Sequence, residues 1–197
     1  VSRQVALNCL DMEKKLHTSE GSYGHNTNTR SIIGIKLTTR NNRDEPIELS
    51  EAIGERGQFE DVFTSAKPMF EKIDALYLQL LDKKEAVKPV SGYVDVILAS
   101  DLAGILAHEA IGHTTEGDIV RAGSVAADYL NKVVANELVT LVDFANTHNG
   151  ETLPVPVYLD DEGVSSQDAV IIDKGVLKSY MHNKESAEYF DMPLTGN

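Results

Sequence analysis

The residues with the clearest chemical potential in this sequence form the hexapeptide HEAIGH at positions 108–113. Neutral imidazoles bind transition metals, and a carboxylate beside them can accept a proton from a metal-bound water. In the zinc-binding pattern HExxH the two histidines are four residues apart and lie on one helix face. Here the spacing is five, so a regular α-helix places His113 about 140° around the axis from His108.

Two departures from a regular helix would bring both histidines to one ion. A π-bulge adds one residue to a helical turn and is frequent at functional sites. Alternatively, the helix ends at Gly112 and His113 returns from non-helical backbone. Gly112 suits either arrangement because it has no Cβ. Without such a departure, the two histidines point in different directions and Glu109 is a solvated side chain.

Two carboxylates follow the histidine pair, at Glu116 and Asp118. They could supply a third metal ligand, or they could accept hydrogen bonds from the imidazole N–H groups and so orient the rings. The alternative is a charged loop after the helix. The remaining histidines are isolated in predicted strands or loops and are interpreted as surface or packing residues: His17, His25, His148 and His182.

Charge and composition exclude several classes of protein. The chain has 18 Lys and Arg against 31 Asp and Glu and a net charge of −13, which argues against nucleic acid or an anionic membrane as a partner. The single cysteine, Cys9, rules out an intramolecular disulfide and an all-thiolate metal site and fits a cytoplasmic setting. No apolar run approaches the roughly 20 residues of a membrane helix.

The N-terminal part of the sequence predicts a small sheet with one packed helix. Strands are expected at residues 5–9, 15–19 and 32–39, with turns at 11–14 and 41–44. Thr64 or Ser65 can cap a helix that ends near Glu85. Apolar residues recur there at the three- and four-residue spacing of one helical face: Met69, Ile73, Leu76, Tyr77 and Leu80.

The second part of the sequence mixes helices and strands without a regular βαβ order. Helices are expected at residues 101–113, 125–136 and 184–190, strands at 93–99, 138–144 and 155–159, and a loop at 117–123. Lys174-Gly175 between two apolar runs is typical of a β-hairpin. The predicted fold class is α+β, with a small N-terminal sheet and packed helix followed by a mixed-sheet segment that carries the HExxxH helix.

The segment KPVSG at residues 88–92 is typical of a linker. We therefore predict an N-terminal domain over residues 1–88 and a second domain over residues 89–197. The chain begins at Val1 and ends at Asn197, and both domains are interpreted as truncated, the first at its start and the second at its end.

From about residue 100 onward the sequence resembles the TldD/PmbA family. The HExxxH motif runs on into Glu116-Gly117-Asp118, and four later segments are similar to successive blocks of that family: residues 142–143, 160–163, 174–181 and 194–197. The N-terminal strands, through residues 19–21, are similar but weaker. Because the PmbA/TldE branch lacks the HExxxH motif, the chain resembles the TldD branch.

The resemblance implies a metallopeptidase of unfolded or short peptides, usually zinc-dependent and paired with a PmbA/TldE-type subunit. It assigns His108 and His113 as metal ligands and Glu109 as general base. The third ligand of the family is a cysteine near the C-terminus of the full protein, which Cys9 does not match. The resemblance therefore predicts that the metal site and the activity of this fragment by itself are incomplete.

These observations leave three hypotheses. The first is proteolysis by a metal-activated water, with Glu109 as general base and the peptide bound as an added β-strand. The second is a catalytically incomplete fragment or subunit that acts as a peptide-binding or interaction module, in a homo- or hetero-oligomer. The third, a Ser or Cys hydrolase, is disfavoured because no Gly-x-Ser-x-Gly elbow is present and Cys9 has no histidine near it in sequence.

Overall fold

The computed structural model describes residues 1–196, which form two compact units. The first unit contains residues 1–13 and 27–94, and the second contains residues 14–26 and the chain from Asp95 onward. The tip of the first hairpin thus belongs with the second unit. The domain boundary between residues 88 and 89 stays a prediction.

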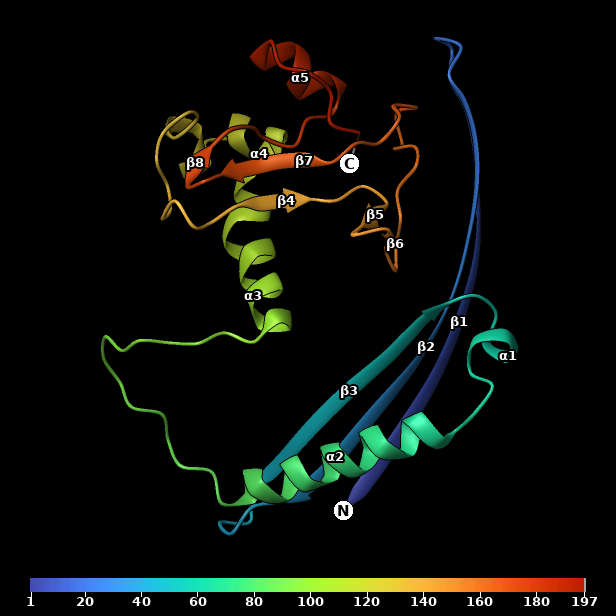
Figure 1. The fold of residues 1–197 in the computed structure, drawn as a ribbon, viewed down its shortest axis with the longest axis vertical. Coiled ribbons are helices and arrows are strands. Elements are labelled where there is room, and N and C mark those ends of the chain that lie inside the picture. The colour runs from blue at the N-terminus through green and yellow to red at the C-terminus, as the bar shows by residue number, and fades with distance from the viewer. Residues whose placement is uncertain (197) are drawn as a thin grey trace. The chain divides into compact units, whose positions relative to one another are not determined.

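The first unit is a three-stranded sheet covered by a helix. Its strands are β1 (Ser2–His17), β2 (Tyr23–Arg40) and β3 (Pro46–Arg56), in the order β1-β2-β3. The short helix α1 (Phe59–Val62) precedes α2 (Lys67–Lys84), which lies along one face of the sheet (Figure 1). Apolar residues of β2 and α2 form the core: Ile33, Ile35, Leu37, Leu76 and Leu80. The predicted α2 and its packing on a small sheet are confirmed.

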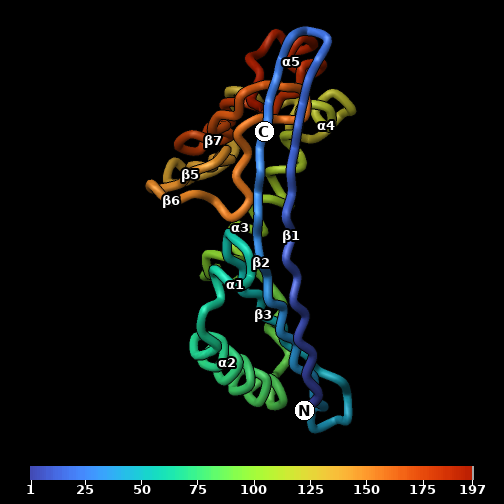
Figure 2. Tube along the Cα trace, turned by 90° about the vertical axis from the view of Figure 1, so that its right-hand side faces the viewer, coloured from blue at the N-terminus to red at the C-terminus, as the bar shows by residue number. Residues whose placement is uncertain are grey.

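The predicted turn at residues 11–14 is wrong. Strand β1 continues through this segment, and β1 and β2 run side by side along their length (Figure 2). The chain reverses at the tip, where the Thr18 N–H donates to the Ser22 carbonyl at 3.0 Å. The side chains of β1 are nearly all exposed, so polar residues are compatible with strand there and do not signal a turn.

The second unit combines short helices with two small sheets. Its helices are α3 (Ser100–Ala107), α4 (Gly117–Arg121) and α5 (Lys184–Phe190), and its strands are β4 (Leu141–Asp143), β5 (Thr147–His148), β6 (Glu151–Thr152), β7 (Ala169–Asp173) and β8 (Val176–Leu177). The antiparallel sheets have the orders β4-β7-β8 and β5-β6. The core of this unit is an apolar cluster to which β7 and β8 contribute: Val120, Ala126, Ile171, Ile172, Leu177 and Tyr180. The α+β class is confirmed.

Several local predictions for the second unit are tested by this arrangement. The hairpin at Lys174-Gly175 is confirmed, with both residues at positive φ, 46° and 80°, as a tight two-residue turn requires. Helix α5 is also confirmed. The predicted helix over 125–136 is wrong, because a 3₁₀ turn (Val125–Asp128) ends there and Asn131 has a left-handed backbone with φ of 62°.

Three further predictions are corrected. Residues 117–123 contain helix α4 rather than only loop. Within residues 1–196, segment 93–99 has no regular secondary structure, and segment 155–159 has a single bridge, from Leu159 to Ser165, in place of a strand. None of the described helices has both the length and the apolar character needed to cross a bilayer.

Candidate metal centre

The two histidines of the motif flank a π-helical turn (His108–Gly112) that continues directly from α3. The His113 N–H donates to the His108 carbonyl, five residues earlier. This is the first of the two arrangements that the spacing left open. Gly112 keeps a right-handed helical backbone, and a Cβ added there would make only ordinary contacts at 3.7 and 3.9 Å. The π-turn therefore does not depend on the missing Cβ.

Two threonine hydroxyls satisfy the carbonyl groups at this irregular helix end. Thr114 Oγ1 donates to the Ala110 and Ile111 carbonyls at 3.1 and 3.0 Å. Thr115 Oγ1 donates to the Ile111 and Gly112 carbonyls at 2.8 and 3.0 Å, and Thr115 is only 1% exposed. A tightening of the helix into a 3₁₀ turn (His113–Thr115) follows. The threonines after the motif thus stabilise the carbonyl end of the π-turn.

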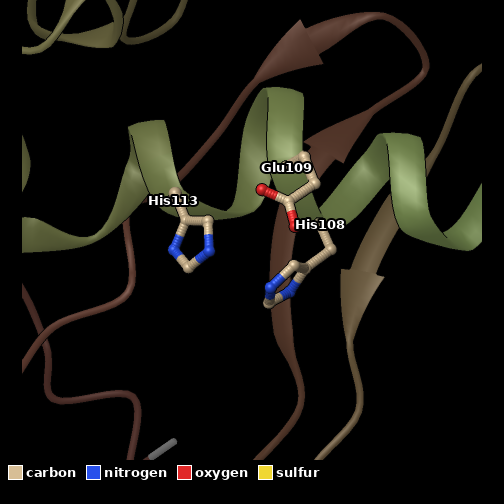
Figure 3. A group of neighbouring side chains, drawn as sticks. All are labelled: His108, Glu109 and His113. Atoms are coloured by element: carbon tan, nitrogen blue, oxygen red, sulfur yellow. The ribbon is translucent and has the colours of Figure 1, made fainter.

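The π-turn brings two imidazoles and one carboxylate together. One possible ligand atom from each of His108, Glu109 and His113 lies within 4.8 Å of the other two. The imidazole centroids are 4.4 Å apart, with the ring planes at 68°. Figure 3 shows the three side chains projecting toward one another from the same stretch of helix. A tetrahedral zinc ion holds its ligand atoms about 3.4 Å apart, a spacing that these exposed side chains can reach by small rotations.

The two later carboxylates are placed differently. Glu116 Oε1 lies 2.6 Å from His113 Nδ1. A carboxylate that accepts the Nδ1–H bond leaves the Nε2 lone pair of that imidazole for a metal. Asp118 lies in the first turn of α4, where its Oδ1 accepts the Ile119 N–H at 2.9 Å, and it is not part of the three-residue group. The geometry of Glu116 is that of a partner that orients a ligand.

A cavity of about 620 Å³ opens beside the candidate metal-binding group. Its lining includes His108 and Glu116 of the motif segment, the β4 residues Leu141–Asp143, and the segment from Met181 to Asn183. The volume lies in the range of small-molecule and peptide side-chain sites. Strand β4, at the edge of its sheet, therefore lines the same cavity as His108 of the candidate metal-binding group.

His182, interpreted from sequence as a surface or packing residue, lies in the lining of this cavity. It is 3% exposed, its Nδ1 lies 3.1 Å from Ser186 Oγ, and its ring packs near Tyr180 and Phe190. Its Nε2 has no hydrogen-bond partner within residues 1–196. Burial lowers its pKa. Its neighbours range from Tyr180 and Ser186, close in sequence, to Gly117 far earlier in the chain, so a local pattern does not reveal its place beside the motif.

The sequence matches the family model described as the PmbA/TldA metallopeptidase C-terminal domain over residues 91–197. It is 41% identical over 137 residues to a metalloprotease of Methanocaldococcus jannaschii, covering 65% of this chain and 30% of that protein. It is 31% identical over 186 residues to a zinc metalloprotease TldD homolog of Saccharolobus solfataricus, covering 93% of this chain and 40% of that protein. The chain thus spans less than half the length of these relatives.

Two solved structures share the fold at low sequence identity. One is a protein of Thermotoga maritima described as a modulator of DNA gyrase, with a TM-score of 0.71 and 17% identity over 98% of this chain and 42% of that one. The other is TldE from Thermococcus kodakarensis, with a TM-score of 0.61 and 16% identity over 91% of this chain and 38% of that one. Because the family model covers more than half of the sequence, this chain belongs to the PmbA/TldD family of metallopeptidases.

Proposed function

We propose that this chain carries the metal-binding residues of a zinc-dependent peptidase that hydrolyses unfolded or short peptides. The observation that supports this most directly is the π-turn, which gathers His108, Glu109 and His113 into one group of ligand atoms. Two imidazoles are donors suited to zinc, and a carboxylate beside them suits a general base. Relatives named as metalloproteases, one of them as a zinc metalloprotease, support the same assignment.

In this proposal each residue of the group has a distinct task. His108 and His113 hold the ion through ring nitrogens, and Glu116 fixes the tautomer of His113 by accepting its Nδ1–H. When bound, zinc supplies a water of lowered pKa and polarises the scissile carbonyl. Glu109 accepts the proton of that water and delivers it to the leaving amine. Glu109 serves as the base and Glu116 is engaged by His113, so any further zinc ligand comes from another residue.

The peptide itself would bind along β4. This strand is at the edge of its sheet and lines the cavity beside His108. A substrate that pairs with a strand edge is held by main-chain hydrogen bonds, which favours unfolded chains without a strict sequence rule. Equal affinity for a folded protein and for its unfolded form would count against this mode of binding.

The test is Glu109→Gln in the longest natural polypeptide that contains this sequence, assayed on an unstructured peptide. Peptide hydrolysis should fall by at least about 100-fold because the general base is lost, while bound zinc per chain stays the same. Glu71→Gln on α2, an exposed residue of the first unit, is the matched control and should hydrolyse normally. Hydrolysis at the wild-type rate by Glu109→Gln would overturn the assignment.

A peptide-binding or partner-subunit role is the second candidate. It is favoured by the fold shared with TldE, and it predicts assembly with a PmbA/TldE-type subunit or with a second copy. Elemental analysis separates the two proposals. About one zinc per chain supports the peptidase, whereas no zinc in this chain or in its longest natural form supports the interaction module.

A further inference from the structure

We propose that a buried seat, formed by Gly117, His182 and Ser186, positions Glu116 against His113 and so tunes the metal centre. The proposal rests on the proposed function only for the statement that His113 binds zinc. The positioning of the Glu116 carboxylate beside the His113 imidazole does not depend on zinc. The three seat residues are buried and lie beside the cavity of the candidate metal centre.

Two backbone hydrogen bonds to Met181 fix the chain on either side of Glu116. Met181 N–H donates to the Thr115 carbonyl at 2.9 Å, and Gly117 N–H donates to the Met181 carbonyl at 2.8 Å. These two bonds make a parallel bridge between Glu116 and Met181. Glu116 is itself extended, with φ −64° and ψ 130°, between a 3₁₀ turn and α4. The direction of its side chain therefore depends on this bridge rather than on a continuous helix.

Gly117 fits against the other two seat residues with no space for a side chain. A Cβ at this position would lie 2.5 Å from Ser186 Oγ, 2.7 Å from Ser186 Cβ and 2.9 Å from His182 Nδ1. Ser186 is 2% exposed and His182 is 3% exposed, so neither can move aside into solvent. A residue larger than glycine must shift either the Glu116–Gly117 backbone or the segment that carries His182 and Ser186, and we expect the first, with a displaced Glu116 carboxylate.

Hydrogen bonds hold the seat in place. His182 N–H donates to Thr195 Oγ1 at 2.8 Å, and Thr195 Oγ1 donates to the His182 carbonyl at 3.1 Å. Ser186 N–H donates to the Asn183 side chain at 2.8 Å, which caps α5. The His182 ring is joined to Ser186 Oγ at 3.1 Å. Segments far from the motif in sequence thus determine where Glu116 lies.

The position of Glu116 affects the candidate metal centre through the tautomer of His113. His113 Nδ1 lies 2.6 Å from Glu116 Oε1, which favours the tautomer with a proton on Nδ1 and a lone pair on Nε2. Partners of this kind raise the basicity of a ligand imidazole, and their loss typically weakens metal binding about 10- to 100-fold. Gly117, His182 and Ser186 are therefore positioning residues that act through Glu116.

The first test is Gly117→Ala, examined by zinc titration and by ¹⁵N NMR of the metal-free histidines at pH 8. We expect zinc affinity to fall about 10- to 100-fold and the Nδ1–H tautomer of His113 to lose its predominance. Adding Ser186→Gly removes two of the three atoms that the new Cβ would meet, and should restore both signals toward wild type. Gly34→Ala, whose Cβ would meet nothing closer than 3.9 Å, is the matched control.

The second test asks whether Gly117 acts through Glu116. In a Glu116→Ala background, Gly117→Ala should cause no further loss of zinc affinity, although it still lowers the melting temperature. Additive losses, or an unchanged His113 tautomer in Gly117→Ala, would overturn the proposal. If Gly117→Ala does not fold, Thr195→Val takes its place, and it should weaken zinc binding more than Thr195→Ser, which keeps the hydroxyl.

These outcomes separate the inference from the proposed function. A wild-type chain that binds no zinc, yet shows a Glu116-dependent His113 tautomer that Gly117→Ala abolishes, retains the positioning role and loses the metal centre. A chain that binds zinc through His108 and His113 with no response to Gly117→Ala retains the metal centre and loses the positioning role.

Discussion

The two compact units of this protein differ in the contacts that define them. In the first unit, residues of β2 pack against Leu76 and Leu80 of α2, and the regular spacing of apolar residues specifies both surfaces. In the second unit an apolar cluster is accompanied by buried polar residues whose hydrogen bonds hold turns, loops and helix ends: Thr115, Asp160, His182, Ser186 and Thr195. A sheet and a helix can be built from periodic apolar residues, whereas the candidate metal centre also depends on an irregular helix and on hydrogen bonds that follow no period.

Helix regularity differs in the same way. Helix α2 is continuous over 18 residues. In the second unit, α3 passes into a π-turn and a 3₁₀ turn, and after the extended Glu116 the chain enters α4. Each change of helical geometry alters which side chains share a face, and the π-turn is the change that brings His108 and His113 together. The irregular helical segment therefore carries the candidate metal ligands, whereas the regular helix α2 contributes to the apolar core of the first unit.

The largest effect that would sharpen this comparison is expected from Leu80→Ala. Leu80 is 0% exposed in the core of the first unit, so the substitution should cost about 2–5 kcal/mol of that unit's unfolding free energy. Leu78→Ala on the same helix, at a residue 61% exposed, should cost less than about 0.5 kcal/mol. Urea unfolding measures both variants.

Zinc titration of the same two variants tests whether the units respond separately. We expect the zinc affinity of the folded Leu80→Ala chain to match wild type, because the candidate ligands lie in the second unit. A common loss of first-unit stability and zinc affinity would show that the two units behave as one cooperative structure, and the contrast drawn above would fail.

The parts of the fold that could be predicted from sequence follow the same division. Met69, Ile73, Leu76 and Leu80 specify α2 because burial repeats with the helical period. Lys174-Gly175 specifies a hairpin because a tight turn needs two residues at positive φ. The prediction of a turn at residues 11–14 was wrong because an exposed strand tolerates polar residues on both faces.

Prediction of the candidate site was less complete for a physical reason. The five-residue spacing of His108 and His113 allowed a π-turn or a helix end, and only the backbone bond from His113 to His108 distinguishes them. Glu116 and Asp118 were equivalent as sequence, but in the structure Glu116 Oε1 lies 2.6 Å from His113 Nδ1, whereas Asp118 Oδ1 accepts the Ile119 N–H. His182 lies beside the motif through its approach to Gly117, a residue far earlier in the chain, and a local pattern cannot encode that approach.

Lowering the pH should have a smaller effect on stability, and we expect it in the second unit, which contains His182. Burial lowers the pKa of His182 from its ordinary value of 6.5, so the folded state favours the neutral ring and the unfolded state binds the proton more readily. This contribution to stability is present above about pH 6.5 and is lost as the pH falls below it, by at most about 1.4 kcal/mol per pH unit.

Thermal unfolding between pH 7.5 and pH 5.5 measures this effect. The melting temperature of the second unit should fall, and His182→Gln should flatten that dependence, whereas His148→Gln at an exposed position should not. An identical pH dependence in wild type and His182→Gln would assign the acid sensitivity to other groups and weaken the case that buried polar contacts distinguish this unit.

The smallest effect is expected from the ion pair between the hairpin tip and α5, which lies within the second unit. Lys184 Nζ is 2.6 Å from Glu20 Oε2, with side-chain exposures of 37% and 68%. The hydrogen bond and charge of Lys184 lower the pKa of Glu20. The pair therefore stabilises the fold above the ordinary pKa of a glutamate, and this contribution is lost as the pH falls through the lowered value.

Exposed ion pairs contribute little and are screened by salt. Lys184→Gln should therefore shift the melting temperature of the second unit less than the acid effect at His182 does, and the shift should vanish at high ionic strength. Lys178→Gln, another exposed lysine of this unit, is the control, and Glu20→Gln with Lys184→Gln completes a double-mutant cycle. A coupling that persists in high salt would mean that the hairpin tip is anchored by this pair, and that surface charge as well as buried polarity sets the second unit apart from the first.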